Sequence, residues 1–241
     1  MLEGVIMIIK KDIMASSKNY TSCSSRNIKY IVIHGTGHVA PCKNFALNLK
    51  NNKCSGSAHY FVGDGEIRQV INDNDIAWHV GNPKNCYKVK MSNVKNNNSI
   101  GIEMCETNVK TGNVSQETIK LTGELVRMLM KKYNIPTSRV IRHFDVLSKP
   151  CPTGFLTDSK WKSLKQQLVN GETTINVTEN YLAKVLCETL NCRSGAGTNY
   201  PIVRQIHKGT VITIVAQNGN WLQAKMGYWV NKNYMEYIRK V

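Results

Sequence analysis

The chain has 241 residues, of which 41% are hydrophobic, and its 32 Lys and Arg against 16 Asp and Glu give a formal charge of +16. This length allows one or two domains, and the apolar fraction is sufficient for a buried core. No run approaches the ~20 apolar residues that span a bilayer, which excludes stable membrane insertion through a helix. The charge predicts an anionic partner, and nucleic acid, an anionic membrane and a teichoic-acid-bearing wall all qualify.

The N-terminal residues 1–11 contain only a short apolar run at 5–9, which follows an acidic residue. They show neither the long apolar core nor the small-residue cleavage site of a signal peptide. We therefore expect the chain to stay in the cytoplasm of its host until another factor releases it.

Cysteine is unusually frequent for a chain without an export signal. We expect free thiols rather than a disulfide framework, because such frameworks are typical of short secreted chains. If a bridge forms, the first pair to examine is Cys42 with Cys54. Only Cys151, next to prolines, sits in a context that suggests chemistry. The eight cysteines are Cys23, Cys42, Cys54, Cys86, Cys105, Cys151, Cys187 and Cys192.

Apolar periodicity in the first 170 residues predicts strands alternating with helices, which is an α/β pattern. Strands are expected at 28–34, 58–62, 66–71, 99–105 and 140–143, and helices at 41–52, 115–133 and 159–169. Gly63-Asp64-Gly65 predicts a hairpin, because Asp-Gly supplies the positive φ angles of a tight turn. Ser115 is suited to cap the longest helix.

The composition changes after residue 169. Residues 170–180 are polar and lack aromatic side chains, so they predict a linker. Short β-like segments and turn residues in 181–241 predict a small all-β domain. Lys and Arg outnumber Asp and Glu in both parts, so attraction to a polyanion is a property of the whole chain.

Three side chains have the chemistry of zinc ligands. His34 and His143 each end a predicted strand, and Cys151 follows eight residues after His143. Zinc accepts imidazole nitrogen and thiolate sulfur, and a catalytic site keeps three protein ligands and one open position. Taken singly, each residue is equally consistent with a structural role, since buried histidine and cysteine are common in protein cores.

Five segments resemble, in order, the zinc-dependent N-acetylmuramoyl-L-alanine amidase family, which includes phage endolysins, bacterial autolysins and peptidoglycan recognition proteins. The resemblance covers about residues 25–155 and implies a mixed sheet flanked by helices, in a catalytic domain of residues 1–169. It also implies that one Zn²⁺ is held by His34, His143 and Cys151. Asp145 is close to His143 along the chain, but this short spacing suits a ligand less well, so we expect it beside the ligands and not among them. The segments are VIHGTG (32–37), SAHYFV (57–62), AWHVG (77–81), NNNSIGIEMC (96–105) and IRHFDVLSKPCP (141–152).

Other side chains also have expected roles. With the resemblance, Glu103 is expected to be the general base, and a structural ion pair is the alternative for a carboxylate in an apolar strand. Lys149, two residues before Cys151, is the candidate that stabilises the oxyanion on the attacked carbonyl, and a solvated surface lysine is the alternative. His59 stands where some relatives carry a catalytic tyrosine, although a core histidine is as consistent with the sequence. Trp78 and His79 are expected to line the substrate groove, and a core position is the alternative for Trp78.

The stretch 190–238 resembles the bacterial SH3-like domains that are attached to wall hydrolases. The resemblance implies a small SH3-like barrel at 181–241 that binds the wall. Its aromatic residues Trp221, Tyr228 and Trp229 are expected to form an exposed surface, and filling the core of the barrel is the alternative for each. Arg193 and Tyr200 are further contact candidates. The motifs that carry it are NCRSGAG (191–197), KGT (208–210), GNW (219–221) and GYW (227–229).

Together these patterns predict a peptidoglycan hydrolase that cleaves the amide bond between N-acetylmuramic acid and L-alanine with zinc-activated water. We expect a phage or prophage endolysin, with anionic wall polymers as further partners. A bacterial autolysin and a recognition protein that binds peptidoglycan without cutting it are the alternatives. Nucleic acid is not an expected partner, because the lysines are scattered and no nucleic-acid motif is present.

Overall fold

The structure is a computed structural model, and it describes residues 8–81, 86–170, 175–198 and 200–241. The chain divides into two compact units, Met1–Gly171 and Glu172–Val241. Within the described ranges, no helix is both long and apolar enough to cross a membrane.

The first unit is built on a six-stranded mixed sheet with the order β1-β5-β4-β7-β3-β8. β7 lies between β4 and β3 and runs parallel to both, β8 is parallel to β3, and β4 and β5 form an antiparallel hairpin. A two-stranded sheet pairs β2 with β6. The strands are β1 (Ile9–Lys10), β2 (Tyr20–Thr21), β3 (Tyr30–Gly35), β4 (Tyr60–Gly63), β5 (Glu66–Gln69), β6 (Ile76–Ala77), β7 (Ser99–Met104) and β8 (Val140–Arg142).

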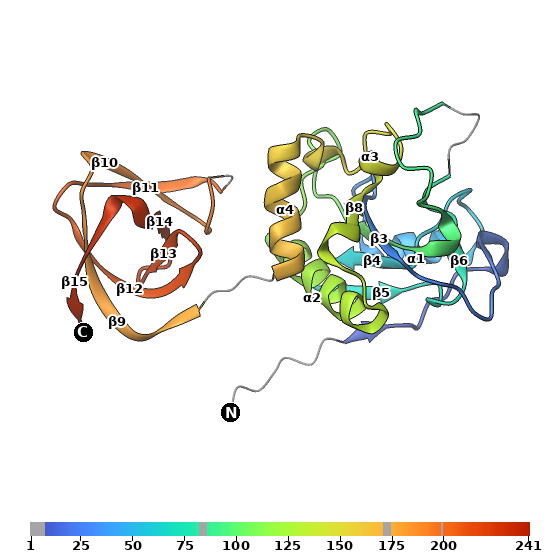
Figure 1. Cartoon of the computed structure of the whole chain (residues 1–241), viewed down its shortest axis with the longest axis horizontal. Helices are drawn as coiled ribbons and strands as arrows, with labels where there is room; N and C mark the ends of the chain where they lie inside the picture. The colour runs from blue at the N-terminus through green and yellow to red at the C-terminus, as the bar shows by residue number, and fades with distance from the viewer. Residues whose placement is uncertain (1–7, 82–85, 171–174, 199) are drawn as a thin grey trace. The chain divides into compact units, whose positions relative to one another are not determined.

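Helices cover the sheet from both sides, as expected for the predicted α/β class (Figure 1). α2 (Gln116–Tyr133) and α4 (Asp158–Asn170) share a core with Ile31 and Ile33 of β3, whereas α1 (Cys42–Lys50) packs with Phe61 of β4. Because side chains alternate along a strand, His34 points away from the α2 and α4 face. The short helices are α3 (His143–Val146) and the 3-10 turns Ser17–Asn19, Asn96–Asn98, Thr137–Arg139, Thr153–Phe155 and Lys232–Tyr234.

The predicted helix cap and hairpin turn lie where the sequence indicates. Ser115 accepts a hydrogen bond from the Thr118 amide at the start of α2. Asp64 and Gly65 have φ angles of 51° and 71° between β4 and β5, as a two-residue turn with positive φ requires. The predicted helices and hairpin are confirmed.

His143 differs from its predicted position, because it begins a helix instead of ending a strand. β8 stops at Arg142, whose amide and guanidinium both donate to the carboxylate of Asp145, at 3.1 and 2.8 Å. These bonds stabilise the first turn of α3 directly after the strand, so His143 lies one residue past the sheet edge.

Cys42 and Cys54, the first pair to examine for a bridge, do not form one. All eight cysteines are free thiols, and the sulfur nearest to Cys42 Sγ belongs to Cys105, at 3.0 Å. Cys42 is the first residue of α1 and faces the core, whereas Cys54 is exposed beyond the end of that helix.

The second unit is all β, as predicted, with a seven-stranded antiparallel sheet in the order β11-β10-β14-β13-β12-β9-β15. β9 already begins at Ile175, so residues 175–180 are not the predicted linker. These residues include the β-branched Ile175, Val177 and Thr178, and the backbone pairs with β12 at positions 216 and 217. The strands are β9 (Ile175–Val185), β10 (Thr189–Arg193), β11 (Ile202–His207), β12 (Val211–Asn218), β13 (Trp221–Ala224), β14 (Trp229–Asn231) and β15 (Met235–Lys240).

Candidate active site

The candidate site lies at the carboxyl ends of three neighbouring parallel strands. His34 is the penultimate residue of β3, Glu103 is the penultimate residue of β7, and His143 follows β8 directly. His34 and Glu103 are register partners, so their side chains leave the same face of the sheet. The carboxyl edge of parallel strands is where α/β proteins build binding sites.

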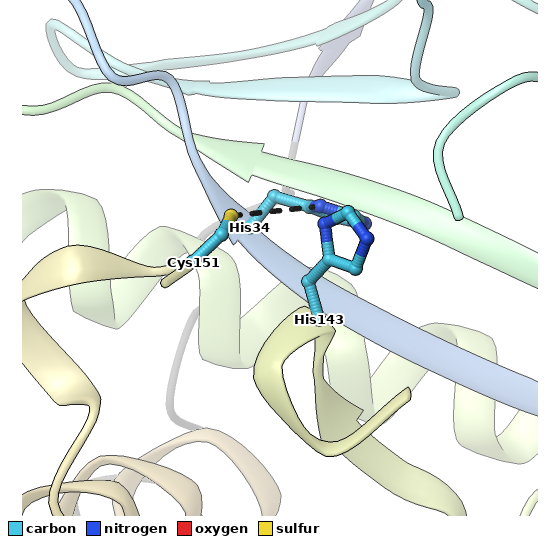
Figure 2. Close-up of side chains that lie close together, drawn as sticks. All are labelled: His34, His143 and Cys151. Carbon is cyan, nitrogen blue, oxygen red and sulfur yellow. Dashed lines mark hydrogen bonds between the residues drawn. The ribbon is translucent and has the colours of Figure 1, made fainter. Parts of the chain in front are cut away.

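Cys151 reaches this edge from the segment after α3. Its carbonyl accepts from the Phe144 amide and its own amide donates to the Lys149 carbonyl, both at 2.8 Å. Its Sγ lies 3.8 Å from Nδ1 of His34. Figure 2 shows the side chains of His34, His143 and Cys151 converging from three separate segments of the chain.

These three residues, which we call the His-His-Cys group, could hold a metal ion. One ligand atom from each lies within 4.8 Å of the others, and all three residues are buried. Both ring nitrogens of His143 lack a hydrogen-bond partner in the described structure. A buried imidazole with two unsatisfied nitrogens is costly unless a ligand uses one of them, so the arrangement fits a bound cation.

The protonation states suit metal binding. Burial lowers the pKa of His34 well below its usual value, assisted by His143 and His79, and burial lowers the pKa of His143 to about 4. Both imidazoles are therefore neutral near pH 7, as ligands must be. Burial and the nearby Glu103 raise the pKa of Cys151 to about 12, so this thiol stays protonated until a cation replaces its proton.

Glu103 is half-buried, and its Oε2 has no hydrogen-bond partner among the described residues. Burial raises the pKa of Glu103 to about 8, whereas the positive charge of Lys149 opposes this shift. The charge of Lys149 also lowers the pKa values of His34, His143 and Cys151, so it acts on all three residues of the His-His-Cys group. The structure therefore brings both predicted catalytic side chains to the site.

Glu106 is an additional acidic group that the sequence analysis missed. It is only 3% exposed, and burial raises the pKa of its carboxyl, whereas an interaction with the backbone of Gly37 opposes this rise. A Cβ on Gly35 would lie 2.3 Å from Glu106 Oε1, so a glycine next to His34 makes room for this carboxylate. No sequence signal identifies it, because it lies beyond the end of β7, where strand alternation no longer applies.

The predicted substrate-binding residues lie deeper than expected. His59 is fully buried, and both of its ring nitrogens meet polar groups of the fold, including the Gly101 amide at 3.0 Å and the Asp75 carbonyl at 3.1 Å. His79 is also buried and contacts His34. Neither ring is accessible to a substrate in this conformation. Trp78 is half-buried and donates from Nε1 to Thr21, which leaves part of its ring exposed.

Asp145 does not join the His-His-Cys group. Its carboxylate is bound to Arg142, which also donates to Asp158 and to backbone carbonyls of residues 155–157. This buried guanidinium ties the segment after Cys151 to the base of α3.

The second unit does not present the predicted aromatic surface. Tyr228 packs in the apolar core of this unit, and Trp229 is also buried. Trp221 stays partly exposed. Arg193 donates to the carbonyl of Tyr200, which fixes the loop between β10 and β11.

Comparison with known proteins identifies relatives of both units. A family profile described as N-acetylmuramoyl-L-alanine amidase matches residues 24–154, and one described as bacterial SH3 domain matches residues 188–236. A probable N-acetylmuramoyl-L-alanine amidase of Bacillus licheniformis is 33% identical over 63% of this chain and 44% of that protein. The amidase CwlA of Bacillus subtilis is 32% identical over 65% of this chain and 55% of that protein.

Two solved structures are similar to the first unit. PlyL has a TM-score of 0.57 at 29% identity and is matched over 68% of this chain and 99% of that chain. The PlyG catalytic domain has a TM-score of 0.57 at 30% identity, over 69% of this chain and 96% of that chain. The chain spans about half the length of the curated relatives it matches.

The family match extends over more than half of the chain and includes all three residues of the His-His-Cys group. The chain therefore belongs to the N-acetylmuramoyl-L-alanine amidase family.

Proposed function

We propose that the protein hydrolyses the amide bond between N-acetylmuramic acid and L-alanine in bacterial peptidoglycan. The observation that carries this proposal is the convergence of the His-His-Cys group with Glu103 at one sheet edge, within a chain of the amidase family. Amide hydrolysis requires an activated water, a polarised carbonyl and a proton for the leaving amine, and this edge has a candidate for each.

Zn²⁺ is the proposed ion. Two imidazoles and one thiolate form a ligand set typical of catalytic zinc, with the fourth position open. When bound, zinc supplies a Lewis acid that polarises the carbonyl and lowers the pKa of water toward ~7. We propose that His34, His143 and Cys151 hold this ion.

Glu103 is the proposed general base and acid. Its Oε2 has no partner among the described residues and could take a proton from the attacking water and return it to the leaving nitrogen. Burial raises the pKa of Glu103 to about 8 in the absence of a bound cation, and a cation held by the His-His-Cys group would favour the carboxylate form that a base needs. The ammonium group of Lys149 is proposed to stabilise negative charge on the carbonyl oxygen. Trp78 remains a candidate for contact with the substrate through its exposed ring face.

The second unit is proposed to bind the wall and to hold the first unit near its substrate. The match to a bacterial SH3 domain supports this role. The charge of +16 supports attraction to anionic wall polymers. The likeness of the first unit to a solved structure titled a mutant endolysin from Bacillus subtilis, at 28% identity and a TM-score of 0.54, favours an endolysin that acts from the host cytoplasm after release, with an autolysin as the alternative.

The test is the Glu103→Ala variant on purified walls. Loss of general acid-base catalysis is expected to lower the release of new amino termini by about 10²–10⁴-fold without loss of wall binding. Glu117→Ala, at an exposed position in α2, is the matched control and is expected to keep full activity. Mass spectrometry of the products identifies the bond broken.

A wild-type protein that binds walls without releasing amino termini would instead be a recognition protein. Normal release by Glu103→Ala would refute the assignment of the base, and cleavage at another bond would refute the substrate proposal.

A further inference from the structure

His79 connects the His-His-Cys group to the protein interior. It is 7% exposed, and its Nδ1 lies 3.1 Å from Nε2 of His34. On the other side of the ring, its Nε2 lies 3.1 Å from Oγ of Ser99, whose hydroxyl donates to the Lys95 carbonyl at 2.7 Å. Four groups therefore form one continuous hydrogen-bonded chain.

The hydrogen bonds from His34 to the Lys95 carbonyl have a single consistent order of donors and acceptors once His34 uses Nδ1 as a ligand atom. Nδ1 of His34 is the nitrogen that faces Cys151, so it must be unprotonated to bind a cation. The proton of neutral His34 is then on Nε2 and is donated to Nδ1 of His79. His79 in turn carries its proton on Nε2 and donates it to Ser99, which leaves every link with one donor and one acceptor.

The fold makes room for the ring of His79 and anchors its backbone. A Cβ on Gly101 would lie 2.6 Å from Cγ of His79, so the absence of a side chain in β7 creates the space for the ring. The backbone amide of His79 donates to Oδ1 of Asn96 at 3.0 Å. The rings of His34 and His79 meet edge to face, with an interplanar angle of 83°. In this geometry the Nε2 edge of the His34 ring faces Nδ1 of His79.

We propose that His79 is a positioning residue that fixes the tautomer and orientation of His34, so that the Nδ1 lone pair points at the metal. The proposal rests on the proposed function, because it assumes that the His-His-Cys group binds zinc. Partners of this kind raise the basicity of a ligand imidazole and restrict its rotation, and their removal typically weakens metal binding by ~10–100-fold. The sequence had suggested substrate contact for His79, which its burial does not support.

The test compares His79→Leu with His79→Gln in the full-length protein. Leucine fills the space without an acceptor, whereas the glutamine amide can accept from His34 through its oxygen and donate to Ser99 through its nitrogen. Competition with a chromophoric chelator should show Zn²⁺ bound ~10–100-fold more weakly by His79→Leu, with most of the affinity restored in His79→Gln. The visible absorption of the Co²⁺-substituted protein should change in His79→Leu and return toward wild type in His79→Gln.

Two further variants keep the test informative if His79→Leu does not fold. Ser99→Ala removes the acceptor at the far end and should weaken Zn²⁺ binding less than His79→Leu. His207→Leu, at an exposed histidine of the second unit, should bind Zn²⁺ as wild type does.

Equal Zn²⁺ affinity in wild type, Ser99→Ala and every folded His79 variant would overturn the proposal. Loss in His79→Gln equal to that in His79→Leu would also overturn it, because the hydrogen bonds would then not be the cause. Zn²⁺ affinity is measured without substrate, so a wild-type protein that binds zinc but cleaves no peptidoglycan would refute the proposed function and leave this comparison valid.

Discussion

The two units of the chain differ in what they bury. All buried polar and charged side chains among the described residues lie between Asn19 and His143, in the first unit. They include four histidines and Glu106, whereas the core of the second unit consists of aliphatic and aromatic side chains and one cysteine. Buried polar groups cost stability unless they are paired, so the first unit carries a cost that the second avoids. The comparison indicates that the buried groups suited to chemistry are concentrated in the first unit.

The largest expected difference between the two units is in how much folding stability each loses at low pH. Burial holds the pKa values of His59 and His143 at about 3 and about 4, and those of His34 and His79 well below normal. The unfolded chain binds these protons below pH ~6.5 and the folded chain does not, so unfolding takes up protons and acid favours it. Each histidine contributes at most about 1.4 kcal/mol per pH unit between its two pKa values.

Glu103 and Glu106 act in the opposite direction, because burial raises both pKa values, that of Glu103 to about 8, and a raised carboxyl pKa favours the folded form as pH falls toward ~4.5. Four histidines outweigh these two glutamates, so the metal-free first unit should lose several kcal/mol from pH 6.5 to 4. Calorimetry should show its transition moving to lower temperature, while the second unit, with only the exposed His207, moves less. Glu103→Gln should steepen the loss. Equal shifts of both units would break the comparison.

The sequence could predict the regular elements and the metal-binding motifs of this protein. Regular elements follow from apolar periodicity, and the turn at Asp64 and Gly65 follows from the φ angles those residues accept. The His-His-Cys group was found through ordered motifs, since three residues distant along the chain carry no spacing signal of their own. Local patterns of this kind are readable without tertiary information.

The sequence could not predict side-chain positions that depend on how distant segments pack against each other. The position of His79 requires the gap that Gly101 leaves in β7, and that of Glu106 requires Gly35 in β3. The aromatic residues Tyr228 and Trp229 were predicted at the surface, but a binding aromatic and a core aromatic have the same sequence signal in a small barrel. Tertiary packing decides each of these cases.

Zinc should raise the stability of the first unit alone. A ligand that binds only the folded state stabilises it by about 2.7 kcal/mol at 100 times its dissociation constant. At pH 7, added Zn²⁺ should therefore raise the first calorimetric transition relative to protein treated with a chelator, and the second should stay in place. Cys151→Ala, which removes one ligand, should show a much smaller rise. A zinc-dependent shift of both transitions would mean that the units do not unfold independently.

The smallest expected effect concerns the second unit, where exposure separates two aromatic residues. Trp221 is partly exposed and Tyr228 is buried in the core. Trp221→Ala should weaken wall binding by about tenfold, or about 1.4 kcal/mol, with little change in the unfolding of this unit. Tyr228→Ala should instead destabilise the unit by a few kcal/mol, because it leaves a cavity among packed side chains. Co-sedimentation with purified walls measures the first effect and calorimetry the second. If Trp221→Ala binds walls as wild type does, the wall contact lies on a different face of the barrel.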